Sequence, residues 1–153
     1  MHLLIPLILI ILAHVLFHLP NPSFFYFLAC RENQQSTVTL TNSNGIISPG
    51  YFPKNAVCNW ILTAPIGSVF RISINVYVNR RKLPCSGNYV KIYDGSVVGS
   101  DVMFEHDCSG KKDFSGYFFS SGRHVLLEVK TGAEEKSPGL ILKYETFAKQ
   151  GKL

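Results

Sequence analysis

Apolar and polar residues alternate along most of this chain, and that alternation restricts its fold more than any other feature of the sequence. The clearest run is residues 68–78, SVFRISINVYV, in which every second residue from Phe70 to Val78 is apolar. A period of two predicts a half-buried β-strand, whose side chains point alternately to its two faces. Shorter runs with the same period occur at 38–40, 60–64, 90–92, 125–129 and 140–144.

Turn-forming residues separate these runs. They occur as NSNG at 42–45, SPG at 48–50, SSG at 120–122 and SPG again at 137–139. Gly, Pro, Asn and Ser favour the backbone conformations of tight turns. Short strands at this spacing, with no convincing amphipathic helix, predict an all-β fold, either an antiparallel β-sandwich or a barrel.

The N-terminal segment resembles the apolar region of a secretory signal peptide. Residues 3–19 contain no Lys, Arg, Asp or Glu, and PNP follows at 20–22. We therefore expect residues 1–29 to be a signal peptide cleaved after Ala29, which leaves a secreted, extracellular chain of net charge +5 with no stable membrane span. Two alternatives are an uncleaved membrane anchor and lipid attachment at Cys30.

All four cysteines follow this segment, at positions 30, 58, 85 and 108. An even number of cysteines in an extracellular chain predicts two disulfides, and four cysteines allow three pairings. Zinc sites need closely spaced ligand pairs such as C-x-x-C, which this chain lacks. The cysteines therefore predict a fold stapled by two disulfides.

Several segments, in this order, resemble the CUB domain of extracellular proteins. They are GIISPGYFP from Gly45, CNWILTAPIG from Cys58, CSGNYVKIYDG from Cys85, CSG from Cys108, SSGRHVLLEV from Ser120 and PGLILKY from Pro138. The resemblance runs from Cys30 to about Tyr144. It implies a jelly-roll sandwich of two five-stranded antiparallel sheets, with disulfides Cys30–Cys58 and Cys85–Cys108. We expect a CUB-like domain at 30–146 and a short basic tail at 147–153.

The resemblance also concerns a metal site. Many CUB domains hold a calcium ion with three acids at one end of the sandwich, and the matching positions here are Arg80, Asn88 and Gly132. Calcium takes six to eight oxygen ligands, several of them carboxylates. A cation, an amide and a glycine cannot supply these, so we expect no metal and no other cofactor. Asp94 or the acids at 134–135 would compensate only if a loop were remodelled.

A cluster of bases occupies the same part of the sequence. Arg80, Arg81 and Lys82 lie in one segment shortly before Cys85, and Lys111–Lys112 form a second, smaller pair. Such a cluster attracts acidic proteins or sulphated and other acidic glycans, with an affinity that falls as salt rises. The competing interpretation is an ordinary solvated loop.

No catalytic constellation is expected. His106 and His124 are the histidines that follow the apolar segment, and we expect His106 in a surface turn and His124 at the start of a strand. Cys108 is expected to form a disulfide and so would not be a nucleophile. The serines at 120–121 do not lie between a predicted strand and a predicted helix, as the nucleophile of an elbow motif does. The chain also lacks a nucleic-acid-binding motif. Aromatic residues Trp60, Tyr89 and Tyr93 are expected to be packing and strand residues.

The sequence thus predicts a secreted, non-catalytic binding or adhesion module that recognises an extracellular protein or an acidic glycan through surface loops. Two alternatives stay open. The chain could be a fragment or accessory domain of a larger CUB-containing protease or receptor, or a surface protein anchored by residues 3–19.

Overall fold

The computed structural model describes residues 30–48, 52–77, 87–107, 113–133 and 139–150. The strands in these ranges are β1 (Gln35–Leu40), β2 (Asn44–Ile47), β3 (Val57–Thr63), β4 (Ser68–Tyr77), β5 (Tyr89–Asp94), β6 (Asp101–Asp107), β7 (Phe114–Phe119), β8 (His124–Lys130) and β9 (Gly139–Ala148). Within the same ranges, no helix is long and apolar enough to cross a membrane.

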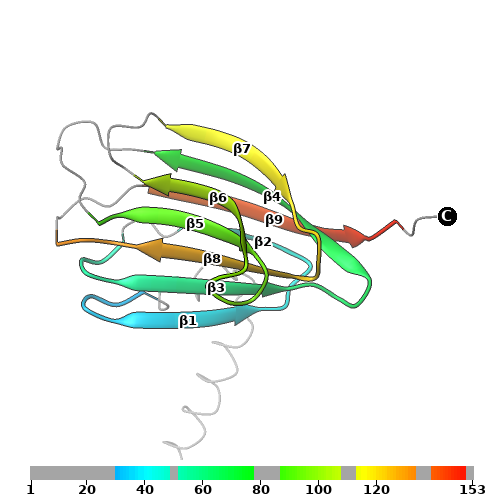
Figure 1. Cartoon of the computed structure of the whole chain (residues 1–153), viewed down its shortest axis with the longest axis horizontal. Helices are drawn as coiled ribbons and strands as arrows, with labels where there is room; N and C mark the ends of the chain where they lie inside the picture. The colour runs from blue at the N-terminus through cyan, green and yellow to red at the C-terminus, as the bar shows by residue number, and fades with distance from the viewer. Residues whose placement is uncertain (1–29, 49–51, 78–86, 108–112, 134–138, 151–153) are drawn as a thin grey trace, which may run out of the picture.

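Two sheets stack face to face, which confirms the predicted β-sandwich (Figure 1). The first sheet has the order β1-β3-β8-β5-β6, and the second has four strands within the described ranges, in the order β2-β9-β4-β7. One pair departs from the antiparallel expectation, because β1 and β3 run parallel. The chain passes from β1 into β2 in the other sheet and then returns, and these two reversals give β3 the direction of β1.

The core lies between the sheets and follows the predicted alternation. Phe70, Ile72, Ile74 and Val76 of β4 have no exposed surface, whereas Arg71 is exposed on the outer face. The other fully buried large side chains include Trp60, Leu62, Ile92, Leu127 and Leu142. Burying one side chain of this size contributes about 1.5–3 kcal/mol. Trp60, whose ring meets Phe52 edge to face at 6.3 Å, is therefore a packing residue as predicted.

A disulfide joins Cys30 to Cys58, with 5.4 Å between their α-carbons. It ties the residue that precedes β1 to the buried side of β3 and confirms the first expected pairing. By the chain-entropy estimate a loop of this size is worth roughly 3–4 kcal/mol. Cys85 and Cys108 lie outside the described residues.

Strands β2, β6 and β7 add to those predicted from alternation, and β6 overturns one expectation. His106 was expected in a surface turn, but it lies within β6 with only 5% of its surface exposed. Its ring stacks on that of Phe104 at 6.2 Å. The expectation was wrong because the two residues, separated by one position in a strand, share the inner face.

The last strand extends beyond the expected end of the domain at residue 146. β9 continues to Ala148, and the next residue, Lys149, donates its backbone N–H to the carbonyl of Gly67 at 2.8 Å. The Lys149 Nζ also donates to the Ser121 carbonyl at 2.8 Å. Residues 147–149, placed in the basic tail by the sequence, are therefore attached to the sandwich.

Candidate functional site

One end of the sandwich brings together the starts of β3 and β5 and the end of β8. Val57 and Tyr89 flank Lys130 in the registers of these strands. The segments 53–56, 87–88 and 131–133 therefore meet at this end, on the left in Figure 1. It carries Asn88 and Gly132, two of the three positions that the resemblance matched to calcium-binding acids.

Those two positions, Asn88 and Gly132, contact each other directly. The Gly132 backbone N–H donates to the Oδ1 of Asn88, whose side chain is almost completely buried at 4% exposure. The amide oxygen at this position is thus engaged by a backbone donor, and the glycine has no side chain. Arg80, the third position, lies outside the described residues. The sequence placed Asn88 and Gly132 at one site but gave no sign that they bind each other.

Thr131 holds the neighbouring backbone and was not singled out in the sequence. Its hydroxyl accepts from the Ala56 N–H at 2.9 Å and donates to the Pro53 carbonyl at 2.5 Å, while its backbone N–H donates to the Ala56 carbonyl at 2.9 Å. The Asn55 N–H donates to the Gly132 carbonyl at 2.9 Å. The sequence signal for this role is a Thr directly after a predicted strand, because its hydroxyl can both accept and donate a hydrogen bond to the adjoining loops.

Two asparagines shape the adjoining turns. Asn33 and Asn55 have φ values of 56° and 50°, in the left-handed region that asparagine tolerates better than most residues. Their side chains join through a hydrogen bond of 3.2 Å from Asn55 Nδ2 to Asn33 Oδ1. The Asn33 N–H also donates to the Lys54 carbonyl at 3.1 Å, so these contacts join the segment before β1 to the segment before β3, beside the disulfide from Cys30 to Cys58 within β3.

Asp94 does not join this end of the molecule. It closes β5 at the opposite end of the strand from Asn88, and six residues of strand span about 20 Å. Both its carboxylate oxygens accept from the Ser121 N–H, at 3.0 and 3.1 Å. In the described part of the chain, no group of three or more His, Cys, Asp or Glu side chains is placed to hold a metal ion.

Three basic side chains of the described segments lie at this end, together with the acids Glu32 and Asp107. Arg31 precedes β1, Lys54 precedes β3 and Lys130 ends β8. Lys130 is exposed, and its Nζ lies 5.9 Å from the centre of the Tyr89 ring. The cluster predicted to bind anions, Arg80, Arg81 and Lys82, lies outside the described residues, between the end of β4 and the start of β5.

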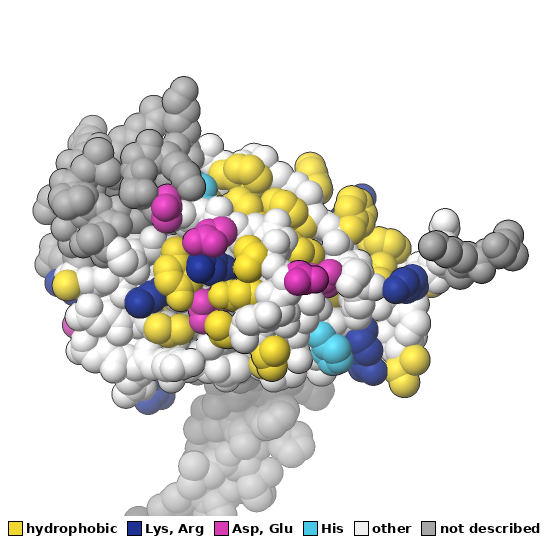
Figure 2. Space-filling view, viewed as in Figure 1, with side chains coloured by type: hydrophobic (Ala, Val, Ile, Leu, Met, Phe, Trp, Pro, Cys, Tyr) yellow, Lys and Arg dark blue, Asp and Glu magenta, His cyan; other side chains and the backbone are white. Residues whose placement is uncertain are grey.

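A second polar cluster covers the outer face of the first sheet. The buried carboxylate of Glu128 accepts hydrogen bonds from the hydroxyls of Tyr89 at 2.8 Å and Tyr93 at 3.3 Å. Beside it Lys91 pairs with Glu105 at 3.3 Å, and Figure 2 shows acidic, basic and hydrophobic side chains intermingled over this face. Burial, reinforced by Glu128, raises the pKa of Tyr89 well above its usual range, and the pKa of Tyr93 rises for the same reasons. Both tyrosines are strand residues, as predicted.

Comparison with other sequences gives matches to parts of much longer proteins. No protein-family model matches the chain. Cubilin of Canis lupus familiaris is 31% identical over 108 residues, which are 67% of this chain and 3% of cubilin. Procollagen C-endopeptidase enhancer 2 of Mus musculus is 25% identical over 117 residues, 74% of this chain and 27% of that protein. Seizure protein 6 homolog of Homo sapiens is 26% identical over 67% of this chain and 10% of its own length.

Comparison with solved structures gives matches to the fold. The full extracellular region of zebrafish Gpr126/Adgrg6 matches with a TM-score of 0.56 and 20% identity, over 74% of this chain and 15% of that one. The MASP-1 CUB2 domain bound to Ca²⁺ matches with a TM-score of 0.51 and 18% identity, over 70% of this chain and 96% of that one. The second match covers nearly the whole of that chain, so the sandwich described above shares the fold of that domain.

Proposed function

Because the chain carries a CUB-like domain, we propose that it is a secreted, non-catalytic binding module that recognises an extracellular protein or an acidic glycan through its surface loops, without calcium. The cations at the end that bears Asn88 and Gly132 would contact the acidic groups of the partner.

The contact between Asn88 and Gly132 carries this proposal. A calcium site needs several carboxylate oxygens converging on one point. Here one position offers a neutral amide whose oxygen already accepts from a backbone N–H, and the other offers no side chain. Without those acids the basic residues at this end, Arg31, Lys54 and Lys130, leave it available to an anionic partner rather than to a cation.

The environments of the histidines support a non-catalytic role. His106 is buried against Phe104, and His124 at the start of β8 forms a hydrogen bond of 3.2 Å with the Thr63 hydroxyl. A general base must reach a substrate proton directly or through one water molecule. A buried ring in the core and a ring engaged with a neighbouring strand do not provide this.

Binding to immobilised heparin at increasing salt tests the proposal. We expect the oxidised protein to bind at low salt, to elute as salt rises, and to behave identically with calcium or EDTA. The triple variant Arg80→Ala, Arg81→Ala, Lys82→Ala should elute markedly earlier. Removing the pair at 111–112 serves as a control for non-specific charge and should matter less. A requirement for calcium, or equal losses in the two variants, would count against the proposal.

A second candidate function rests on the lengths of the relatives. The matched segment spans between 3% and 27% of the cubilin, seizure protein 6 homolog and procollagen enhancer sequences. The domain would then be one accessory module of a larger extracellular protease or receptor, or part of a membrane-anchored surface protein. The full-length transcript, together with the N-terminal residue of the product in culture medium, distinguishes these cases from a free-standing secreted domain.

A further inference from the structure

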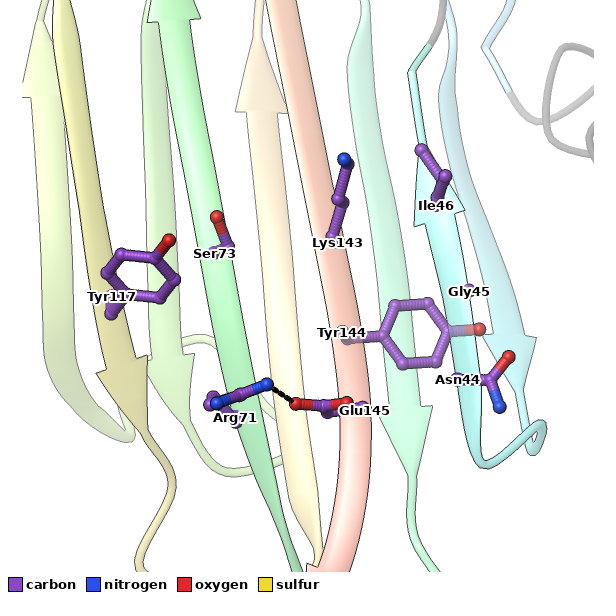
Figure 3. A pocket seen from close by; sticks show the side chains of 9 residues that line it. All are labelled: Asn44, Gly45, Ile46, Arg71, Ser73, Tyr117, Lys143, Tyr144 and Glu145. Atoms are coloured by element: carbon purple, nitrogen blue, oxygen red, sulfur yellow. Dashed lines mark ion pairs between the residues drawn. The ribbon is translucent and has the colours of Figure 1, made fainter.

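A shallow hollow of about 410 Å³ opens on the outer face of the second sheet (Figure 3). Its volume lies within the range of small-ligand sites. The strands β2, β9, β4 and β7 all contribute to its lining. The hollow therefore lies on the face of a sheet, and not among the loops at the Asn88 end.

One row of side chains crosses the hollow from strand to strand. In the register of the sheet, Ile46 lies beside Lys143, Lys143 beside Ser73, and Ser73 beside Tyr117. Neighbouring strands are about 4.8 Å apart, so the backbones at Lys143 and Tyr117 are separated by about 10 Å. In Figure 3 the Tyr117 hydroxyl points toward Ser73, and Lys143 projects from the next strand.

These side chains offer three kinds of contact. Tyr117 is 70% exposed, which is unusual for an aromatic ring and leaves its face open to solvent. Ser73 adds a second hydroxyl, which can donate and accept. Lys143 is exposed, and within the described residues it forms no ion pair.

The adjacent row of side chains, Asn44, Glu145 and Arg71, contributes no net charge to the hollow. Arg71 and Glu145 pair with each other, as the dashed line in Figure 3 shows, and Asn44 lies beside Glu145 in the register. The charge of Arg71 is thus matched within the row. Lys143 is left as the single unmatched charge of the lining, which favours a ligand with one acidic group.

We propose that this hollow binds a sugar ring that carries one carboxylate or sulfate. The apolar C–H face of the ring would pack on Tyr117, its hydroxyls would bond Ser73 and the Tyr117 hydroxyl, and its acidic group would meet Lys143. A sugar matches this lining because hydroxyl, amide and ammonium groups surround a single exposed ring, with Ile46 as the one exposed aliphatic side chain. The proposal shares the ligand class of the proposed function but assigns it to a different surface.

Amide NMR spectra of the oxidised protein, titrated with D-glucuronate, glucose 6-sulfate and D-glucose, test this site. The two acidic probes distinguish carboxylate from sulfate, and D-glucose is the neutral control. We expect either acid to shift the signals of Ser73, Tyr117 and Lys143, with a Kd at least 5-fold lower than that of D-glucose. Lys143→Gln should raise that Kd at least 5-fold. Lys91→Gln removes the same charge from the outer face of the other sheet, where Lys91 pairs with Glu105, and should leave this Kd unchanged.

Each outcome decides between the two surfaces. Acidic sugars that shift only signals at the Asn88 end, or that bind Lys143→Gln normally, overturn the sheet-face site and leave the proposed function intact. If the sugars bind the hollow but the Arg80, Arg81 and Lys82 variant is retained on heparin as strongly as the parent protein, the sheet-face site is supported and the proposed role of the basic loop is rejected. An acidic peptide that shifts these signals where both sugars fail would also overturn the proposal. The chemical-shift changes are first recorded on the unmodified protein, so this part of the test does not depend on any variant folding.

Discussion

Replacing Asn88 by alanine should destabilise the domain measurably, because it removes the acceptor of the Gly132 N–H. Asn88 is 4% exposed, so water is largely kept from that donor. A buried donor left unsatisfied costs about 1–3 kcal/mol. Each kcal/mol lowers the Tm of a domain of this size by roughly 4 °C, so we expect Asn88→Ala to unfold roughly 4–12 °C below the parent protein.

The assay is thermal unfolding with disulfides intact, repeated in urea to obtain the free energy of unfolding. Asn44→Ala is the matched control, because it makes the same chemical change at an exposed position and should stay within about 0.5 kcal/mol of the parent. If Asn88→Ala lost no more free energy of unfolding than Asn44→Ala, the hydrogen bond to Gly132 would not be holding the loops together, and the role assigned to Asn88 would be wrong.

The same assay tests calcium. A ligand present at about 100 times its Kd stabilises the folded state by about 2.7 kcal/mol, a shift of roughly 10 °C here. We expect no shift between EDTA and millimolar calcium, because Asn88 and Gly132 supply no carboxylate. A clear rise in Tm with calcium would refute the metal-free interpretation even if Asn88→Ala behaved as expected.

Two further predictions concern stability. An alanine Cβ at Gly45 would lie 2.5 Å from the Tyr144 hydroxyl oxygen, so Gly45→Ala should cost about 1–3 kcal/mol in urea unfolding. Gly122→Ala, where nothing lies within 4 Å, should cost little, and equal effects of the two changes would contradict the packing argument. The raised pKa of Tyr89 means that the folded state holds the phenolic proton more tightly than the unfolded chain. The contribution of Tyr89 to stability should therefore be full below the ordinary tyrosine pKa of about 10 and be lost as pH rises beyond it. The free energy of unfolding should fall less above that pH in Tyr89→Phe than in the parent protein, and an equal fall in both would contradict this prediction.

Strand positions that bury one complete face could be predicted from the sequence. In β4 the burial of Phe70, Ile72 and Ile74 follows directly from the period of two. β2 could not be predicted in the same way. It has four residues, and Gly45 fits there because Tyr144, almost a hundred residues later, packs over it. Such a strand depends on its partner more than on its own sequence.

The candidate site could likewise be predicted only in part, because most of its contacts depend on the register of distant strands. Resemblance placed Asn88 and Gly132 at one end of the fold, but a hydrogen bond between residues 44 positions apart depends on the register of β5 and β8. His106 was misplaced because the polar residues around it suggested a turn, whereas its partner Phe104 determines the face. The hollow lined by Ser73, Tyr117 and Lys143 needs the register of three strands, which no local pattern contains.

The position of β9 imposes an order on folding. This strand, Gly139–Ala148, is the last of the second sheet in the chain and lies between β2 and β4, so these two earlier strands are joined only through it. Because synthesis begins at the N-terminus, this sheet cannot be completed until residue 148 has been made, and until then β2 and β4 expose unpaired edges. Pairings between such distant segments form slowly. Until residue 148 has been synthesised, these unpaired edges leave the nascent domain prone to aggregation.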